Sequence, residues 1–308
     1  MFTGKNIAVL CGGDGREREV SLRSGKAVCD ALNETGDFHA ELLDLKALSE
    51  VSKVKNYDGA FIAMHGDWGE GGILQAKLSE MKIPYTGSGP EASALAMNKW
   101  KSQEIFRREN IRTPDGVIWP VPFEEIKAKF GCNVVVKPSS GGSTVGISII
   151  HDANALELTK AAYLAKENYS SCDVIIEEYI AGRELTCAVW ENSGKVEALP
   201  IIEIKPHEGY YDYKNKYTAG STEYIVPASL TDEENLQVSE MAVKAHKVLG
   251  CSGYSRSDFR LAQDGKAYIL EVNTAPGMTA TSLTPKAAKA KGVNMPDFVK
   301  AIMLMAHF

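Results

Sequence analysis

A carboxylate and an amide lie two residues apart near the C-terminal end of the chain, at Glu271 and Asn273. The surrounding segment AYILEVN predicts a buried strand, and alternation along it points both side chains to one face. Asp258 lies on the earlier apolar segment GYSRSDFRL, and residues 263–265 form a short turn between the two segments. The segments can therefore pair as a hairpin. Three oxygen ligands would then meet, as Mg²⁺ or Mn²⁺ requires.

Arg256 precedes Asp258 by two residues and shares its face of the predicted strand. An arginine beside a metal cluster can stabilise the oxyanion that forms during acyl transfer. Each acid taken alone could be an ordinary polar residue at a strand end. The combination of oxygen ligands and an arginine favours a metal-dependent catalytic site.

Lys137 ends the apolar segment NVVVKP and is followed by the small-residue segment PSSGGSTVG. Small residues let backbone N–H groups approach phosphate oxygens, and a lysine adds a positive charge. A surface loop without a ligand has the same composition. A lysine on a buried strand needs a partner, however, and this favours phosphate binding. The chain contains no Walker A sequence and no protein-kinase motif.

The segment IIEEYIAGRE places two carboxylates after another apolar strand. Alternation directs Glu177 and Glu178 to opposite faces. One of them could accept an adenine amino group, while backbone groups near Tyr179 and Ile180 read the ring edge. Glu184 could reach a ribose hydroxyl. An interdomain linker with solvated acids is the alternative interpretation.

Residues 12–15, Gly-Gly-Asp-Gly, follow the first predicted strand. A dinucleotide-binding turn needs a third glycine where this chain has Arg18, which disfavours a nicotinamide-dependent oxidoreductase. A helix N-terminus behind a glycine turn still suits an anion or a zwitterion. Glu17 could bind a substrate ammonium or could simply interact favourably with the helix dipole, and both readings stay open. His65 also follows a strand end.

Residues 206–223 form a long polar loop with four tyrosines, together with Lys214 and Lys216. Loops of this length in compact domains are usually functional or disordered, and we expect a lid. Lys216 could then clamp a phosphate or a carboxylate. A solvated surface lysine is the alternative.

The whole chain of 308 residues is long enough for two or three lobes. Its net charge of −6 argues against non-specific nucleic-acid binding. The six scattered cysteines, without a CxxC pair, are typical of reduced thiols in a cytoplasmic protein. No apolar run approaches the roughly 20 residues that cross a bilayer, so we expect no membrane association.

Three lobes are expected, with boundaries at 1–89, 90–178 and 179–308. Strands at 6–11, 39–45 and 59–66 alternate with helices at 20–32 and 73–81, and IPYTG closes the unit, which predicts a parallel sheet. A helix at 90–109 leads to a small α+β lobe with strands at 133–138, 144–150 and 173–180 around a helix at 155–167. Strands at 184–190 and 198–204, a helix at 231–249 and the metal hairpin form the last, antiparallel lobe.

Six motifs in order resemble the D-alanine–D-alanine ligases of the ATP-grasp superfamily, and the resemblance runs essentially end to end. They are GGDGREREVSLRSG, AMHGDWGEGGILQ, PYTGSG, VVVKPSSGGSTVG, YDYKNKYTAGSTEY and EVNTAPGMTATSL. The resemblance implies an α/β and α+β protein with an ATP-grasp fold: a Rossmann-like N-terminal domain, a small central α+β lobe and a C-terminal antiparallel-sheet lobe.

The implied reaction joins two D-alanines for the bacterial cell-wall precursor. The carboxylate of the first D-alanine attacks the γ-phosphate of ATP and becomes an acyl phosphate. The amine of the second D-alanine then attacks that carbonyl, and phosphate leaves. The resemblance also implies two Mg²⁺ or Mn²⁺ ions and a homodimer.

The same resemblance assigns roles by motif. For the first D-alanine, Glu17 would hold the ammonium, with His65 nearby, and Ser143 and Tyr217 would link Glu17 to the closed lid. The oxyanion would be stabilised by Arg256 and the Gly277 amide. The carboxylate of the second D-alanine would be held by Ser282 and the Leu283 amide. Phosphate contacts would come from Lys99, Lys137 and Lys216, of which Lys216 could also meet substrate. The adenine and ribose pocket would comprise Glu177, Tyr179, Ile180 and Glu184. The metal ligands would be Asp258, Glu271 and Asn273.

The chain departs from the family pattern at two places. Residues 255–258 read Ser-Arg-Ser-Asp where the family usually has Gly-Arg-Ile-Asp, and we expect a packing difference because Ser257 faces away from the metal site. Gly15 and Arg16 replace a serine and a small residue, which bears on the contact with the first amine.

Three alternatives to this ligase remain besides the oxidoreductase. Another ATP-grasp carboxylate–amine ligase is one. A ligase that joins D-alanine to D-lactate is a second, and Tyr217 argues against it because lactate-forming relatives have a histidine there. A non-catalytic nucleotide sensor is the third, and it would need neither Arg256 nor the metal cluster.

Overall fold

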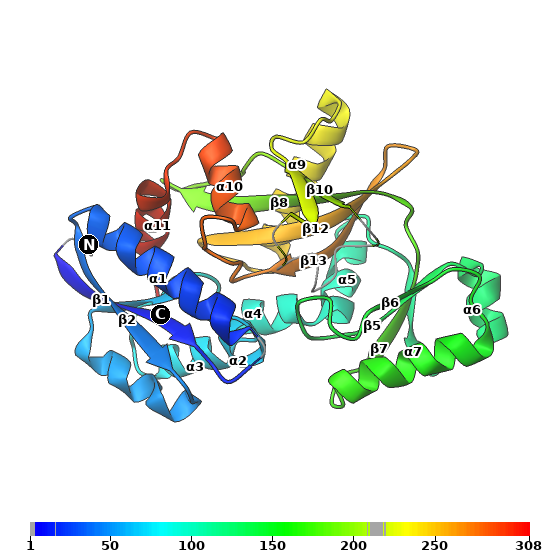
Figure 1. Ribbon diagram of the computed structural model, residues 1–308, viewed down its shortest axis with the longest axis horizontal. Helices are drawn as coiled ribbons and strands as arrows, with labels where there is room; N and C mark the ends of the chain where they lie inside the picture. The colour runs from blue at the N-terminus through cyan, green and yellow to red at the C-terminus, as the bar shows by residue number, and fades with distance from the viewer. Residues whose placement is uncertain (1–3, 16, 208, 210–217, 219) are drawn as a thin grey trace.

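The computed structural model describes residues 4–15, 17–207, 209, 218 and 220–308. These residues form three sheets, each with its own helices, around a common centre (Figure 1). All six cysteines are free thiols; Cys11, Cys187 and Cys251 are buried and the others are partly buried. No helix of the described segments is long and apolar enough to cross a membrane.

The N-terminal sheet is parallel, as predicted, with the strand order β2-β1-β3. Its elements are β1 (Lys5–Gly12), α1 (Arg18–Glu34), β2 (Phe38–Leu45), η1 (Leu48–Asn56), β3 (Gly59–Ile62), α2 (Asp67–Glu70) and α3 (Ile73–Glu80). IPYTG does not form a strand. Its Tyr85 instead makes isolated bridges to Ala60 and His307.

The single helix expected at 90–109 is wrong, because the chain forms α4 (Pro90–Met97) and α5 (Lys99–Arg108). Asn98 separates them in an extended conformation, and its side chain accepts a hydrogen bond from the Lys101 amide at 3.0 Å. Asparagine is a preferred N-cap residue. Because α5 begins after Asn98, Lys99 is its first residue. This places Lys99 beside the cavity described below.

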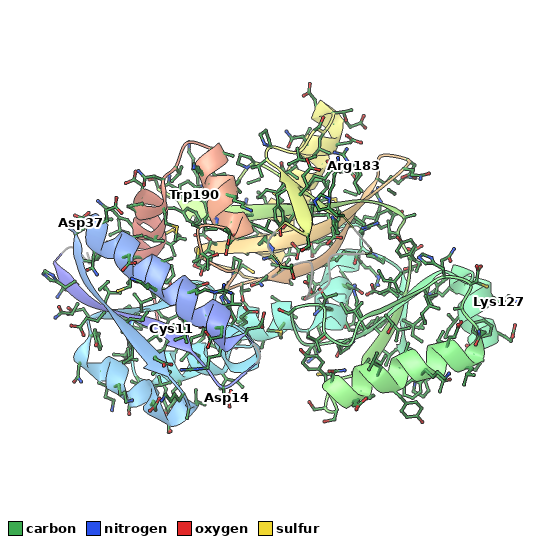
Figure 2. The ribbon with its side chains drawn as sticks, viewed as in Figure 1. Cys11, Asp14, Asp37, Lys127, Arg183 and Trp190 are labelled. Atoms are coloured by element: carbon green, nitrogen blue, oxygen red, sulfur yellow. The ribbon has the colours of Figure 1, made fainter. Side chains whose placement is uncertain are left out.

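The central sheet is antiparallel, with the order β4-β7-β5-β6. Its elements are β4 (Gly116–Trp119), α6 (Phe123–Phe130), β5 (Val134–Pro138), β6 (Ser148–Ile150), α7 (Ala155–Asn168) and β7 (Val174–Glu178). β4 and α6 were not predicted. β6 begins at Ser148, four residues later than expected, because residues 139–147 form a loop that reaches toward α1. Lys127 on α6 marks the far end of this lobe in Figure 2.

The third sheet has six strands in the order β11-β10-β8-β12-β13, with β9 paired to β8. Its elements are β8 (Gly182–Asn192), β9 (Lys195–Ala198), β10 (Ile202–Pro206), β11 (Thr222–Ile225), α9 (Asp232–Val248), β12 (Tyr254–Ala262) and β13 (Ala267–Asn273). Strand β9 was not predicted. Helix α9 starts with a capping box in which Thr231 and Glu234 satisfy each other's backbone N–H groups.

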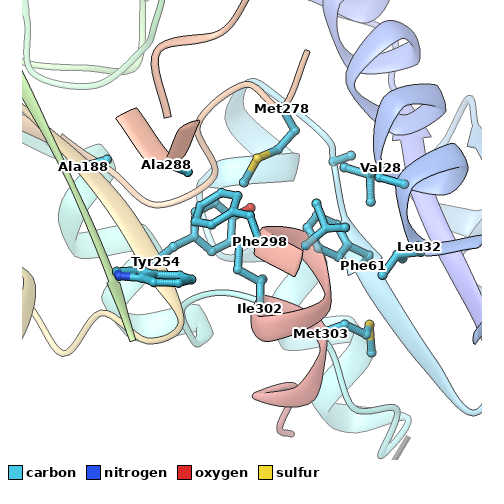
Figure 3. Packing of buried hydrophobic residues seen from close by; sticks show 14 of the residues in the cluster. Val28, Leu32, Phe61, Ala188, Tyr254, Met278, Ala288, Phe298, Ile302 and Met303 are labelled. Atoms are coloured by element: carbon cyan, nitrogen blue, oxygen red, sulfur yellow. The ribbon is translucent and has the colours of Figure 1, made fainter. Parts of the chain in front are cut away.

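Two C-terminal helices, α10 (Leu283–Ala290) and α11 (Met295–Leu304), tie the third sheet to the first. Phe298 and Ile302 of α11 are buried in one cluster with Val28, Phe61 and Trp190 (Figure 3). Burial of such side chains contributes roughly 1.5–3 kcal/mol each. This shared core, which also contains Met278, fixes α1 relative to β8 and the segment after β13. The lobe boundaries stay a prediction.

Candidate active site

The hairpin predicted from the C-terminal motif is confirmed: β12 pairs with β13, and Asp258 lies opposite Glu271. Arg256 lies opposite Asn273. The register shifts between Asp258 and the next residue, which is a β-bulge. Bulges re-aim side chains next to active sites, and this one lies at the proposed metal ligands.

Each acid of the hairpin pairs with a base. Arg256 donates to both oxygens of Asp258, at 2.9 and 2.8 Å, and Thr186 Oγ1 adds a hydrogen bond of 2.6 Å. Lys99 Nζ lies 3.1 Å from Glu271 Oε2. The Asn273 side-chain oxygen accepts the Ala275 amide at 2.9 Å. These pairs balance the charges of the cluster.

The donor set fits a hard divalent cation, because two carboxylates and an amide oxygen meet on adjacent strands. No three His, Cys, Asp or Glu side chains in the described part of the chain form a metal cluster. The side-chain amide of Asn273 lies on the same face of β13 as Glu271 and would be the third protein ligand at the hairpin.

Lys99 connects the hairpin to the glycine-rich loop of the central lobe. Its buried ammonium donates to the Gly141 carbonyl at 2.7 Å, and its backbone N–H donates to Ser139 O at 2.7 Å. Gly141 itself has φ +112° and packs against the ring of Tyr169, where an added Cβ would lie 2.4 Å from a ring carbon. The loop therefore has a glycine where the ring leaves no room.

The buried lysine of β5 forms an ion pair with an acidic side chain of β7. Lys137 Nζ lies 2.7 Å from Glu177 Oε2, with 6% and 2% of the two side chains exposed. The other oxygen of Glu177 accepts a hydrogen bond of 2.6 Å from Gln103 of α5. Lys137 and Glu177, expected at phosphate and adenine respectively, are thus in direct contact.

Arg260, which the sequence did not single out, organises the segment after β7. It donates to the carbonyls of Ile180, at 3.1 Å, and Gly182, at 2.7 Å. Its guanidinium also lies 3.6 Å from Glu184 Oε2 and 5.9 Å from the centre of the Tyr179 ring. The two-residue spacing from Asp258 was the available signal, because it places Arg260 on the same side of β12.

Glu17 is the N-cap residue of α1, and the hydroxyl of Ser143 donates to its Oε1. Ser143 and Thr144 have φ values of +53° and +62°, a conformation that non-glycine residues seldom adopt. Such strain often marks functional loops. The loop of the central lobe thus reaches the N-terminal domain at Glu17.

His65 joins the N-terminal domain to the segment after β13. Its Nδ1 lies 3.1 Å from Glu70 Oε1 and 3.2 Å from the Ala275 carbonyl, so it faces two acceptors and carries a proton. Its Nε2 lies 3.3 Å from Ser24 Oγ, which accepts the Met278 amide. Burial lowers the pKa of His65, but the hydrogen bond and charge of Glu70, with other nearby groups, leave it above its usual value. The sequence did not identify Glu70.

The opposite side of the site is the start of α10. Ser282 is its N-cap residue, yet its side chain does not cap the helix and instead accepts the Thr279 amide at 3.1 Å. A Cβ at Gly277 would lie 2.9 Å from Ser282 Oγ, so a larger residue there would displace the Ser282 hydroxyl. Leu283 is the first helical residue, and its N–H belongs to the electropositive helix end.

One cavity of about 630 Å³ brings these groups together from all three lobes. The predicted residues that line it are Glu17, His65, Lys99, Ser143, Arg256, Glu271, Asn273, Gly277, Ser282 and Leu283. Predicted residues that do not line it are Lys137, Glu177, Tyr179, Ile180, Glu184 and Asp258. Arg23, Glu70, Tyr224 and Lys286 also line it, although the sequence did not single them out. Lys216 and Tyr217 lie outside the described residues, as does Arg16.

The departure at Ser257 has the expected structural result. Ser257 is buried on the face of β12 opposite Arg256 and Asp258. Within the described residues its hydroxyl has no hydrogen-bond partner. Its neighbour Ser255 lies 2.8 Å from Nδ1 of the buried His246. The departure therefore lies on the packed side of the strand, while Arg256 and Asp258 lie on the other side.

Comparison with known proteins gives a consistent result over the full chain. Residues 102–304 match the model of the D-ala D-ala ligase C-terminus. A D-alanine–D-alanine ligase of Anaeromyxobacter dehalogenans is 43% identical and one of Cupriavidus metallidurans is 41% identical; they cover 98% and 97% of this chain, which spans 97% and 91% of them. The solved D-alanine–D-alanine ligase of Bacillus anthracis has a TM-score of 0.84 at 34% identity, covering 97% of this chain and 96% of its own. VanG D-Ala:D-Ser ligase of Enterococcus faecalis also has a TM-score of 0.84, at 29% identity, covering 98% and 99%.

Proposed function

Since the chain belongs to the D-alanine–D-alanine ligase family, we propose that it joins two D-alanines to D-alanyl-D-alanine at the expense of ATP, for the peptidoglycan precursor. The single observation that carries this proposal is the composition of the cavity. It combines a carboxylate at Glu17, a guanidinium at Arg256 and a helix N-terminus at Leu283. These three groups match an ammonium, an oxyanion and a carboxylate.

The first D-alanine binds at the N-terminal domain. The Glu17 carboxylate accepts hydrogen bonds from the substrate ammonium, and the hydrogen bond from Ser143 holds this carboxylate in place. His65 adds polarity beside Glu17 and is itself oriented by Glu70. The carboxylate of the first D-alanine and the γ-phosphate of ATP are both negatively charged and repel each other. Cations around them are therefore needed for the carboxylate to approach the phosphate.

The second step takes place between Arg256 and α10. The amine of the second D-alanine attacks the acyl phosphate, and the charge on the former carbonyl oxygen is stabilised by Arg256 and the Gly277 amide. Ser282 and the Leu283 amide hold the carboxylate of the second D-alanine. Removing one donor of this kind typically costs about 3–4 kcal/mol in the barrier.

Asp258, Glu271 and Asn273 are proposed to hold two Mg²⁺ or Mn²⁺ ions. Such ions, when bound, neutralise the triphosphate and stabilise the leaving oxygen. Lys99 then lies where it can contact both the loop carbonyl and a phosphate. Arg256, already on the same strand face, is available to the reacting carbonyl.

The nucleotide is assigned to groups on α5, β5, β7 and β8 and on the segment after β7. Lys99 and Lys137 contact phosphates, Glu177 and the backbone of Tyr179 and Ile180 contact adenine, and Glu184 contacts ribose. Lys216 and Tyr217 are proposed to close the site from the loop at 206–223. A water-free site protects an acyl phosphate from hydrolysis.

We propose further that the protein is a cytoplasmic homodimer. The dimer rests on the family resemblance alone, and the cytoplasm on six free thiols together with the nature of the substrates. Light scattering on a size-exclusion column measures the mass directly, and a mass near the 33.5 kDa of one chain would contradict the dimer.

The proposed activity is tested by release of phosphate from ATP with Mg²⁺ present. Release should require D-alanine and should be absent with L-alanine. D-serine and D-lactate, offered together with D-alanine, test the choice of second substrate. Mass spectrometry should identify D-alanyl-D-alanine as the main product at neutral pH. A main product containing lactate or serine would overturn the assignment of the second substrate.

The metal assignment is tested separately with Glu271→Gln. Loss of a metal ligand should lower kcat by at least about 100-fold. Even mutation of a residue that only hydrogen-bonds to a metal ligand typically lowers metal affinity or activity about 10- to 100-fold. Mn²⁺ binding measured by electron paramagnetic resonance should weaken in parallel. Glu233→Gln, which changes an exposed acid on α9, is the matched control. Normal turnover and normal Mn²⁺ binding in Glu271→Gln would exclude Glu271 as a ligand.

A further inference from the structure

Lys286 is a half-buried lysine in the first full turn of α10, and it lines the cavity. Its backbone N–H donates to Ser282 O, which makes Lys286 the first residue bonded within the helix. Side chains in a helix lean toward its N-terminus. The side chain of Lys286 therefore extends over the turn that contains Ser282 and Leu283.

The position is electrostatically unfavourable for a cation. The N-terminal end of a helix carries about half a positive charge, so a lysine in this turn is repelled. Burial also lowers the pKa of Lys286, with no acidic neighbour among the causes. Its ammonium lies 4.0 Å from the centre of the Tyr224 ring, whose face attracts a cation. In the described part of the chain no carboxylate forms a salt bridge with it.

The backbone N–H groups at the start of α10 would also be satisfied by an anion. Ser282 does not cap the helix, and among the residues that the structure describes no side chain accepts from the N–H groups of Leu283 and Thr284. The next residue, Pro285, has no N–H to offer. A carboxylate placed here would accept from these amides and would pair with the lysine.

From these observations we propose that Lys286 binds the carboxylate of the second amino acid and makes that carboxylate a requirement for the acceptor. The proposal rests on the proposed function, because it assigns a further residue to the acceptor subsite. Ser282 and the Leu283 amide orient the carboxylate, and Lys286 supplies the full positive charge. The contact with Tyr224 of β11 holds the ammonium at the cavity wall.

The proposal predicts which acceptors the enzyme refuses. D-Alaninamide has the amine of D-alanine but no carboxylate, so it can act only as acceptor. The wild-type protein should use it poorly beside D-alanine. Lys286→Met keeps a long apolar side chain against Tyr224 and removes the charge. In this variant the KM for the second D-alanine should rise about 10- to 100-fold, the value of one charged hydrogen bond.

The KM values for ATP and for the first D-alanine should change less than about twofold in Lys286→Met. Its preference for D-alanine over D-alaninamide should shrink by the same 10- to 100-fold. Lys286→Arg should retain most of the preference, because it keeps the charge. Lys289→Met, one turn further along α10 and exposed, is the matched control and should behave as wild type.

The outcomes separate this proposal from the proposed function. A wild-type protein that releases no phosphate with D-alanine contradicts the function itself. An active wild type with an unchanged acceptor KM and an unchanged acceptor preference in Lys286→Met overturns the role of Lys286. If Lys286→Met has a lowered thermal midpoint, the experiment is repeated with Lys286→Gln. The KM for the second D-alanine and the preference for D-alanine over D-alaninamide then decide in the same way.

Discussion

The buried ion pair between Lys137 and Glu177 makes a strong prediction about stability. Both side chains are almost completely buried, and only Gln103 would remain beside Glu177 in Lys137→Met. Removing one partner of such a pair leaves an uncompensated buried charge and costs about 3–5 kcal/mol. For a chain of this length the thermal midpoint should fall by about 5 °C or more.

The double variant Lys137→Met/Glu177→Gln should recover most of this loss. It removes both charges, and buried pairs replaced by groups of similar size are often close to neutral in stability. The two single variants should therefore each be less stable than the double. The coupling free energy from this cycle should be at least about 3 kcal/mol.

Urea unfolding measured by tryptophan fluorescence is the appropriate assay, because Trp119 lies on β4 of the same sheet as Lys137. Lys127→Met changes an exposed lysine on α6 and should stay within about 0.5 kcal/mol of the wild type. The slope of the transition should stay the same if only stability changes. Equal midpoints for Lys137→Met and Lys127→Met would refute the reasoning, as would a double variant whose loss equals the sum of the singles.

The same variants separate structure from catalysis. If Lys137 also contacts phosphate, the double variant should regain stability and still require far more ATP. Its KM for ATP should stay at least about tenfold above that of Glu177→Gln alone, which loses only the proposed adenine contact. A double variant with normal nucleotide dependence would make Lys137 a purely structural residue.

Two further predictions concern protonation. In Glu70→Gln the pKa of His65 should fall, since burial still lowers it while the raising contribution of Glu70 is gone. Histidine ring NMR over pH measures this pKa, with His246 as the internal control. An unchanged His65 pKa would contradict the prediction. Arg183, labelled in Figure 2, holds the pKa of Glu203 below 4.5 through hydrogen bonds of 3.0 and 2.7 Å. This pair stabilises the fold above the ordinary pKa of a glutamate, and the benefit is lost as pH falls through the lowered pKa of Glu203. Glu203→Gln should therefore unfold more easily than wild type at about pH 7, and the difference should shrink as the pH falls below the lowered pKa. A constant difference across pH would oppose this prediction.

The hairpin of β12 and β13 could be predicted from the sequence because its information is local. Alternation fixed the faces of Glu271 and Asn273, and a short turn fixed the pairing with Asp258. The break at Asn98 was also readable, since asparagine is a common N-cap residue, but the continuous helical pattern around it hid the signal.

The partners of the charged groups could not be predicted, because they come from distant segments. Nothing near Glu271 in the sequence indicates that Lys99 will lie 3.1 Å away. Lys137 was expected to need a partner, but its identification as Glu177 required the register between β5 and β7. Glu70 is close to His65 in the sequence, yet its role depends on burial, which a single sequence does not show.

The arrangement of charges in the site follows one rule, and Lys286 departs from it. Arg256, Lys99 and Lys137 are each oriented by a carboxylate at 2.7 to 3.1 Å, which comes from the same strand for Arg256 and from another element for the two lysines. Cations held in this way need little rearrangement when a substrate charge develops, which is the basis of electrostatic preorganisation. Lys286 is oriented by an aromatic ring instead, at a helix end that repels it. A substrate carboxylate supplies what this lysine lacks, and that is why the acceptor subsite should tolerate changes near the amine better than loss of the carboxylate.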